Sequence, residues 1–315
     1  MKKKVVIMRI IILSVTFLGM GLVPVASNFC KRMYTGKEQV SFINTMETKN
    51  CFISYVLIDE KTYLIKQKKD YKKQLAVIRD ALSAYVAKTL SGIAHEIEII
   101  GARQEFSGKI KQWWPATLHT MASGETVRKQ PKCKYNALRL RQFWAQAQSF
   151  SEKGLTKLII EYMTWHWQLP EIIALDLFIG NSDRHCGNLC YDPTTDKFCA
   201  IDMDDTFNKD LCKLACKKLK YMIEKEKVVF TTDEIAALKL MKNTLQVLTR
   251  KHTPGELIQK LRFFAKQAGF VKGNTLYNER VEKKISYYEL MITKTFKSAQ
   301  QLIALLDKIV EVKNS

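Results

Sequence analysis

The first part of the chain alternates short apolar runs with polar turns, which is the pattern of a small antiparallel sheet. Three runs rich in Val, Ile, Tyr and Phe lie within residues 39–69, separated by the turn sequences ETKN and DEK. Such runs with short polar breaks predict a three-stranded meander. A further strand-like segment, EIEII, occupies residues 96–100. We therefore expect the N-terminal part of the domain to be rich in strands.

Helical patterns follow the third predicted strand. Over residues 70–91, apolar side chains recur at spacings of three to four, which predicts an amphipathic helix that Gly92 ends. A second helix is expected from Leu155 through EYMTWHWQ. A third, PEIIALDLFIG at 170–180, is almost wholly apolar and should be buried. Roughly the last hundred residues have helical patterns with Lys-rich faces.

A polar loop and a β-hairpin are predicted after the apolar helix. Residues 181–188 are polar, a short strand follows, DPTTD provides a turn, and the strand KFCAID ends at Asp202. Residues 101–155 give no clear pattern apart from a dense basic stretch. This order of elements predicts an α+β chain with two lobes, a small antiparallel-sheet lobe with one helix followed by a larger helical lobe.

The N-terminus has a separate pattern. Lysines at positions 2, 3 and 4 precede an apolar run, and Val25-Ala26-Ser27 offers small residues for cleavage. This layout favours a signal peptide or an uncleaved apolar anchor over residues 1–27. The alternative is an over-extended start, with Met33 as the true first residue.

The remainder of the chain is expected to form one domain. Its length of 315 residues allows one large domain or two modest ones, and no repeat or Pro/Ser-rich linker interrupts it. We expect residues 28–38 to be a linker and residues 39–315 to be a two-lobed domain, divided into 39–127 and 128–315.

Composition adds a strong positive charge. The 51 Lys and Arg residues exceed the 31 Asp and Glu residues by 20, and such a field attracts polyanions. Solvation of helix faces is one interpretation of the basic stretches, and an anion site for a phosphoinositide headgroup or an inositol polyphosphate is the other. No recognised DNA- or RNA-binding motif is present, so we do not expect nucleic acid as a partner. The candidate anion-binding residues are Arg128, Lys129, Lys132, Lys134, Arg139, Arg141, Lys213, Lys217, Lys218 and Lys220.

The cysteines bear on the compartment. Eight are scattered along the chain, without the dense spacing of disulfide-stapled domains and without a CxxC pair, so we expect mostly free thiols and no cysteine metal site. Free thiols suit a reducing cytosol. A functional signal over residues 1–27 would instead mean export or membrane anchoring, and a secreted bacterial effector acting in a host cytosol is a third alternative.

The strongest candidate chemistry lies in FIGNSDRHCGNLCYDPTTDKFCAIDMDDTF, residues 178–207. The buried helix delivers Asp183 and Asn188 on the polar loop, and the hairpin presents Asp202 at a strand end. Phosphoryl transfer from ATP needs such a set, with an acid to orient or accept the hydroxyl proton and oxygen ligands to hold Mg²⁺ or Mn²⁺. The five-residue step from Asp183 to Asn188 matches the kinase D-x-x-x-x-N loop.

This stretch resembles the protein-kinase-like superfamily, on the branch of the phosphatidylinositol 3- and 4-kinases, HipA-type bacterial kinases and Golgi secretory kinases. NSDRHCGN is similar to their catalytic loop and AIDMDDTF to their metal-binding segment. The resemblance implies a bilobal kinase-like fold, with Asp183 as the catalytic base and Asn188 and Asp202 as metal ligands. It implies that Arg184 and His185 brace the loop.

The resemblance also implies two residues that hold the nucleotide. Lys66 ends the third predicted strand, where the family places its phosphate-binding lysine, and Lys68 and Lys69 are the alternatives. Asp80 on the first predicted helix is the candidate acidic partner of that lysine, at a position where family members often carry Glu. The alternative for Asp80 is a solvent-facing helix residue.

Two departures from the family pattern stand out. The segment NTMETKN, where kinases place a glycine-rich phosphate loop, contains no glycine, so we expect weak or unusual nucleotide binding. The motif Asp202-Met203-Asp204 also lacks glycine. Asp204 and Asp205 are either further metal ligands or caps of the following helix.

Together these features predict an ATP-dependent and Mg²⁺- or Mn²⁺-dependent kinase. We expect transfer to a hydroxyl of a protein, with autophosphorylation, and regulation by an inositol polyphosphate or another polyanion. A phosphoinositide kinase working at a membrane surface is one alternative. A catalytically weak, pseudokinase-like module that binds polyanions is the other.

Overall fold

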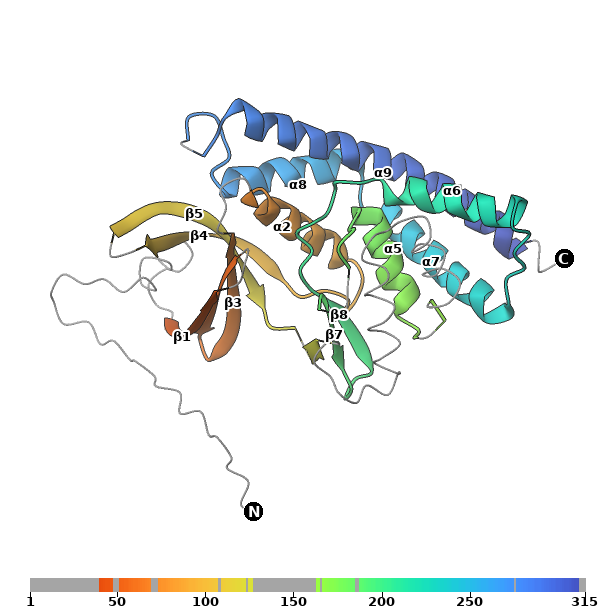
Figure 1. Ribbon diagram of the computed structural model, residues 1–315, viewed down its shortest axis with the longest axis horizontal. Helices are drawn as coiled ribbons and strands as arrows, with labels where there is room; N and C mark the ends of the chain where they lie inside the picture. The colour runs from red at the N-terminus through yellow and green to blue at the C-terminus, as the bar shows by residue number, and fades with distance from the viewer. Residues whose placement is uncertain are drawn as a thin grey trace, which may run out of the picture. The chain divides into compact units, whose positions relative to one another are not determined.

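The computed structural model divides the chain into two compact units. One unit comprises residues up to Gln74 together with Glu98–Met121, and the other comprises Leu75–Ile97 together with Ala122–Ser315. We call them the sheet unit and the helical unit, and Figure 1 shows their elements. The structure describes residues 40–47, 51–68, 73–106, 109–122, 124–126, 163–164, 166–184, 187–274 and 276–311.

A five-stranded sheet with the order β1-β2-β3-β5-β4 forms the sheet unit. Strands β1 to β3 make the antiparallel meander predicted within residues 39–69, which is confirmed. Asp59 and Glu60 at the β2–β3 turn both have positive φ, at 46° and 66°, as a two-residue type I′ turn requires. The strands are β1 (Val40–Glu47), β2 (Cys51–Ile58), β3 (Lys61–Lys68), β4 (Ile97–Phe106) and β5 (Lys109–Thr120).

Apolar side chains of four of these strands form the core of the sheet unit. Successive residues of a strand point to opposite faces, so residues two apart share a face. Val56 and Ile58 on β2 follow this rule, as do Ala116 and Leu118 on β5, and all four are 5% exposed or less. Burying such side chains stabilises the unit by roughly 25 cal/mol per Å² of apolar surface.

The helical unit is built around α5 (Leu169–Ile179), which is buried along most of its length. It packs against α7 (Thr232–Lys251), α6 (Leu211–Glu224) and α9 (Glu279–Glu311). Figure 1 shows α9 running the length of the unit beside these helices. The predicted buried helix over 170–180 is therefore confirmed.

Two further helices complete the helical unit, α2 (Ala76–Ala87) and α8 (Pro254–Gln267), which pack against each other. The helix predicted over 70–91 is shorter than expected, because α2 ends at Ala87 and a turn containing Gly92 follows it. By its contacts α2 belongs with the helical unit. The units thus differ from the expected lobes 39–127 and 128–315 in where this helix lies.

The helix predicted from Leu155 through EYMTWHWQ was given the wrong C-terminal boundary. The described residues between 163 and 168 form turns, and the helix begins only at Leu169. Gln168 donates its backbone N–H to Nδ1 of His166, at 3.1 Å, and such local bonds compete with a helix. Pro170 in the first turn of α5 also favours a helix start at this point.

The predicted hairpin after α5 is confirmed. β7 (Leu189–Asp192) pairs antiparallel with β8 (Lys197–Ala200), and β6 (Glu125–Thr126) adds a short third strand to β7. β8 ends at Ala200, two residues before Asp202. With the small antiparallel sheet and the larger helical part, the protein has the α+β fold class expected from its sequence.

Some expectations fall on residues outside the described ranges. These are the signal or anchor at 1–27, the linker at 28–38 and the basic residues Arg128, Lys129, Lys132, Lys134, Arg139 and Arg141. Among the helices of the described part of the chain, each is too short or too polar to cross a lipid bilayer.

Candidate active site

The polar loop after α5 starts at a glycine that the backbone requires. Gly180 ends α5 in the left-handed conformation, with φ of 64°. A Cβ at this position would lie 2.3 Å from the carbonyl oxygen of Lys209. The backbone N–H of Phe207 donates to the carbonyl of Ile179, at 2.7 Å. The end of α5 is thus held closely against residues 207–209, and only glycine fits the contact.

A buried ion pair organises the loop. Arg184 and Asp176 are each 1% exposed. Nε and Nη2 of Arg184 donate to the two carboxylate oxygens of Asp176, both at 2.9 Å. Two parallel charge-assisted bonds of this kind fix the guanidinium in direction as well as position.

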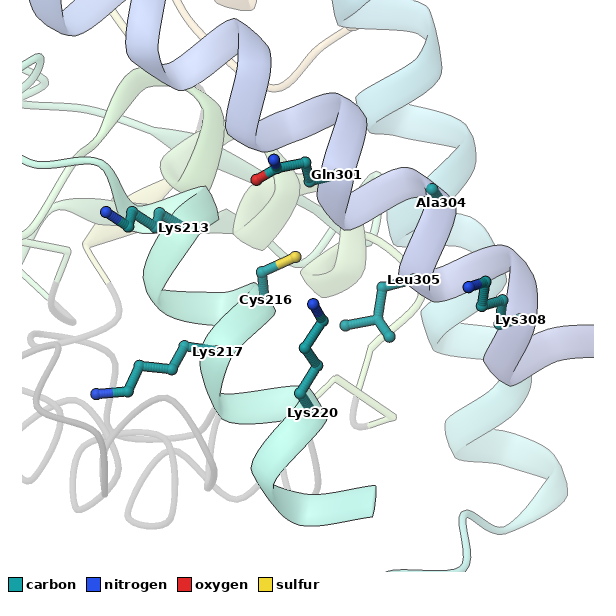
Figure 2. A pocket seen from close by; sticks show the side chains of 8 residues that line it. All are labelled: Lys213, Cys216, Lys217, Lys220, Gln301, Ala304, Leu305 and Lys308. Atoms are coloured by element: carbon teal, nitrogen blue, oxygen red, sulfur yellow. The ribbon is translucent and has the colours of Figure 1, made fainter. Parts of the chain in front are cut away.

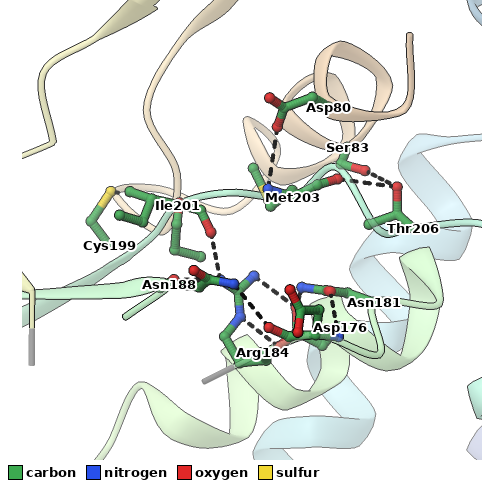
Figure 3. A network of polar contacts seen from close by, with 12 residues as sticks. Asp80, Ser83, Asp176, Asn181, Arg184, Asn188, Cys199, Ile201, Met203 and Thr206 are labelled. Atoms are coloured by element: carbon green, nitrogen blue, oxygen red, sulfur yellow. Dashed lines mark hydrogen bonds and ion pairs between the residues drawn. The ribbon is translucent and has the colours of Figure 1, made fainter. Parts of the chain in front are cut away.

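The remaining nitrogen of that guanidinium connects the loop to the hairpin. Nη1 of Arg184 donates to the backbone carbonyls of Ile201, at 2.8 Å, and Asn188. The N–H of Ile201 donates in turn to the carbonyl of Asn188, at 3.0 Å. Figure 3 shows Arg184 between Asp176 on one side and these two residues on the other. One buried side chain therefore joins α5, the loop and the strand end.

Asp183 combines a fixed backbone with an exposed side chain. Its N–H donates to Oδ1 of Asn181, at 3.1 Å, and its carbonyl accepts from Nδ2 of Asn188, at 2.9 Å. Asn181 is held by its own bond from Nδ2 to Asp176, at 2.9 Å. The side chain of Asp183 is exposed to solvent. A carboxylate held in this way is open to solvent while its main chain is immobilised.

Asn188 and Asp202 lie on neighbouring backbone segments and offer oxygen atoms. The side-chain nitrogen of Asn188 is used by Asp183, so the amide oxygen is its available ligand atom. Asp202 has a φ of 54°, which is uncommon for a residue other than glycine. Mg²⁺ prefers oxygen ligands and is commonly held by one or two carboxylates together with water and substrate phosphates. This donor set fits Mg²⁺ or Mn²⁺.

No larger metal cluster accompanies this pair in the described ranges, where no group of three or more His, Cys, Asp or Glu side chains is placed to hold a metal ion. The described cysteines are free thiols, as expected: Cys51, Cys190, Cys199, Cys212 and Cys216.

Asp80 on α2 holds the segment that follows Asp202. It is 1% exposed, and its Oδ1 accepts from the N–H of Met203, at 3.2 Å. The solvent-facing alternative for Asp80 is therefore wrong. Ser83 and Thr206 share a buried hydrogen bond of 2.8 Å, and Thr206 also donates to the carbonyl of Met203, at 3.2 Å. Figure 3 shows α2 bonded to this segment at both points.

Asp205 also has structural partners. It accepts from Oγ of Ser182, at 3.1 Å, and pairs with Arg79, at 3.5 Å. The cap of α6 is Asp210, which accepts from the N–H of Lys213, at 2.9 Å. The alternative that Asp204 or Asp205 caps the following helix is therefore wrong.

The other nucleotide-binding candidate lies in the sheet unit. Lys66 is 8% exposed and stands on β3 opposite Ile53 of β2 and Thr117 of β5. The hydroxyl of Thr117 donates to the carbonyl of Lys66, at 3.4 Å. Lys68 ends the same strand and is only half-buried. Lys69 and the loop-bracing candidate His185 lie outside the described residues.

The sequence interpretation missed Asp176, whose carboxylate accepts three hydrogen bonds from the loop residues Asn181 and Arg184. A signal was available, because Asp176 is the only charged residue between Ile172 and Gly180 in a helix predicted to be buried. A buried carboxylate must be paired, so a cationic partner could have been sought. The contacts from Ser83 and Arg79 had no such signal, since they join residues more than a hundred positions apart.

Two cysteines lie opposite each other in the hairpin behind the loop, Cys190 on β7 and Cys199 on β8. Burial raises the pKa of Cys190 to about 11. Burial also raises the pKa of Cys199 to about 12, against the opposing effect of nearby Arg184. Both thiols are therefore protonated at neutral pH and serve as packing residues.

Comparisons with known proteins give only distant similarity. No family model matches the chain, and no curated protein does either. Among solved structures, the proinflammatory kinase CtkA of Helicobacter pylori is 12% identical, with 83% of this chain and 95% of that chain covered and a TM-score of 0.45. The N-terminal 618-residue fragment of LepB from Legionella pneumophila is 13% identical, with 84% and 46% covered and a TM-score of 0.40.

A third similar structure is a thermostable mutant of the aminoglycoside phosphotransferase APH(4)-Ia, in a ternary complex with ADP and hygromycin B. It is 13% identical, with 92% of this chain and 98% of that chain covered and a TM-score of 0.30. At such values the similarity is slight, and the function proposed below depends on the site itself.

Proposed function

We propose that this protein is a metal-dependent phosphotransferase with a protein-kinase-like fold, which transfers the γ-phosphate of ATP to a hydroxyl group of a protein. The observation that carries the proposal is the position of Arg184. Through its bonds to Asp176, Asn188 and Ile201, it keeps the Asp183 loop and the Asp202 segment together. A solvated turn needs no such buried cross-connection, whereas a phosphoryl-transfer site needs its groups held in register.

In this proposal each polar group has one task. The Asp183 carboxylate orients the acceptor hydroxyl and takes its proton, while the hydroxyl oxygen bonds to the γ-phosphorus and the bond from that phosphorus to ADP breaks. Asn188 and Asp202 would hold the cation, which would neutralise charge on the phosphates. Lys66 is the proposed lysine that binds the nucleotide phosphates.

Asp80 has a further task in the proposal, beyond the lysine partnership that its helix position implies. Its bond to the N–H of Met203 fixes the residue next to Asp202. A carboxylate from α2 therefore sets the backbone of the metal-binding segment. His185 stays a proposed bracing residue.

The acceptor is proposed to be a protein hydroxyl, including hydroxyls of this chain itself. A phosphoinositide kinase and a pseudokinase-like binding module are the competing outcomes. The destination of label from ATP distinguishes these functions. A kinase would transfer the label to protein or to lipid from the same site, whereas a binding module without turnover would transfer no label.

The test is transfer of label from γ-labelled ATP by the full chain with Mg²⁺ or Mn²⁺, with generic proteins and phosphoinositide vesicles as acceptors. Label on protein that falls at least about 100-fold in Asp183→Ala is the expected result. Asp233→Ala, which removes an exposed carboxylate from the first turn of α7, is the matched control and should transfer normally.

Label on lipid alone would replace the protein acceptor with a phosphoinositide. Equal transfer by Asp183→Ala and the control would reject the site. Absence of transfer by the wild-type chain, with nucleotide binding intact, would favour the binding module.

A further inference from the structure

A basic cavity lies between α6 and α9, on the helical unit. Its volume is about 490 Å³, within the range of small-molecule sites. Four of its lining residues are lysines, and none is acidic among the described residues that line it. The lining consists of Lys213, Cys216, Lys217, Lys220, Gln301, Ala304, Leu305 and Lys308.

The lysines of α6 follow a helical spacing. Lys213, Lys217 and Lys220 are separated by four and three residues, which brings them to neighbouring positions on the helix surface. Like charges at these spacings destabilise a helix. Helix stability alone therefore does not favour this arrangement. An anion bound between the lysines would turn their mutual repulsion into a shared attraction.

Two lysines outside the lining pair with acidic side chains. Lys218, on the same helix, pairs with Glu226 at 3.3 Å. Lys242 on α7 pairs with Asp307 of α9 at 2.8 Å. The described lining of the cavity contains four lysines and no carboxylate.

Figure 2 shows how the cavity is divided between its helices. Lys220 and Cys216 point from α6 into the space between α6 and α9, and Gln301 extends from α9 toward the same space. Lys213 and Lys217 leave α6 on its outer side, at the edge of the cavity. The described lining thus combines lysines from both helices with the smaller side chains of Cys216, Ala304 and Leu305.

We propose that this α6–α9 cavity binds a compact molecule carrying several phosphate groups. Lysines are point charges that suit phosphate, and Gln301 adds an amide that can donate to a phosphate oxygen. No aromatic side chain is among the described residues that line the cavity, so these residues offer no platform on which nucleic acid bases could stack. A soluble inositol polyphosphate and a phosphoinositide headgroup share the required chemistry.

The cavity connects to the proposed metal segment through the start of α6. Asp210 caps α6 at the backbone of Lys213, a lining residue, and accepts from Oγ of Ser298 on α9, at 2.7 Å. Asp210 is eight positions after Asp202 along the chain. A polyanion that draws α6 and α9 together should steady this connection and so raise the transfer rate, a consequence that rests on the proposed function.

Binding is tested by calorimetry of the full chain with inositol hexakisphosphate, which needs no turnover. The double variant Lys220→Ala/Lys308→Ala should weaken binding at least about tenfold. The matched control Lys239→Ala/Lys272→Ala removes the same charge from exposed positions outside the lining and should bind like the wild type. Equal weakening in both variants, or no binding by the wild-type chain, would overturn the proposal.

Vesicles separate the two sources of phosphate. Flotation with phosphatidylcholine vesicles that contain phosphatidylinositol bisphosphate should be lost in the cavity variant if the headgroup is the ligand. Binding of only the soluble polyanion, lost in the same variant, would assign a free ligand. Vesicle binding that the cavity variant retains in full, without soluble binding, would overturn the site.

The regulatory consequence has its own readout. Transfer should rise with the polyanion in the wild-type chain and in the control, but not in the cavity variant. An unchanged rate with intact binding would reject the coupling. Absence of any transfer would reject the proposed function, while calorimetry would still decide the cavity.

Discussion

Two regions of the helical unit treat positive charge in opposite ways. One is the loop-and-hairpin network, formed by Asp176, Asn181, Arg184 and Asn188, and the other is the α6–α9 cavity. In the network, a buried cation has a bidentate anion and two backbone carbonyls, all within the chain. The cavity has four exposed lysines, and no acidic residue is among the described residues that line it. The first arrangement fixes a geometry before any ligand binds, and the second is suited to an anionic ligand.

Breaking the network should have the largest effect. In Asp176→Asn the buried guanidinium of Arg184 loses its counter-charge, and a donor replaces an acceptor, so the free energy of unfolding should fall by about 3 to 5 kcal/mol. Urea unfolding followed by circular dichroism measures this change.

Its matched control is Lys242→Ala, which breaks the more exposed pair with Asp307 and should cost no more than about 1 kcal/mol. If the two variants lost equal stability, the Asp176–Arg184 pair would not be the organising contact of the loop.

The reactivity of the cysteines should also differ between the buried network and the cavity. Cys199 lies behind the network, and burial raises its pKa to about 12. Burial also raises the pKa of Cys216 in the cavity, but Lys220 acts in the opposite direction. Alkylation of the native protein near pH 8, resolved by peptide, should therefore modify Cys216 before Cys190 and Cys199. Faster labelling of Cys199 would contradict the burial of the hairpin.

The same thiols predict an alkaline limit to stability. A raised pKa means that the folded state keeps a proton that the unfolded state loses. The contribution of each thiol to the free energy of unfolding is therefore complete below the ordinary thiol pKa. It is lost as pH rises toward about 11 for Cys190 and about 12 for Cys199. Replacement of both residues by Ala should flatten this loss in unfolding curves measured between pH about 8 and about 11. An unchanged slope would show that other groups cause it.

Removing the cavity lysines should have the smallest effect on the fold. Lys213→Ala/Lys217→Ala/Lys220→Ala removes like charges and adds strong helix formers, so the ligand-free free energy of unfolding should stay the same or rise by up to about 0.5 kcal/mol at low salt. Thermal unfolding without polyanion checks this. A clear loss of stability would mean that these side chains stabilise the ligand-free fold, which would contradict a role confined to anion binding.

The sequence predicted the elements with strong periodicity or strong turn chemistry. The meander, α5 and the β7–β8 hairpin were expected near their observed positions, because each has its pattern within a short window. Helix ends were less predictable. The turns before α5 depend on a bond between His166 and Gln168 that no periodicity reports.

For the site, the short-range motif indicated which residues share the loop, but not what holds them. Asp183 and Asn188 are five residues apart, and their hydrogen bond follows from that proximity. The bonds of Asp80 and Ser83 to residues 203–206 cross more than a hundred positions. Such pairings are set by the packing of α2, and a single sequence contains no signal for them.

Metal-dependent ATP binding by the full chain, measured by calorimetry with and without Mg²⁺, tests the proposed phosphoryl-transfer site most directly. Asp202→Asn keeps a residue that tolerates positive φ but removes the charge, and it should abolish the metal-dependent part of binding. Asp183→Ala should bind ATP with Mg²⁺ like the wild type. The matched control Asp196→Asn makes the same change at another residue with positive φ, 53°, in the hairpin turn, and it should also bind like the wild type. Wild-type binding by Asp202→Asn, or no effect of Mg²⁺ on the wild-type chain, would contradict a phosphoryl-transfer site at this loop.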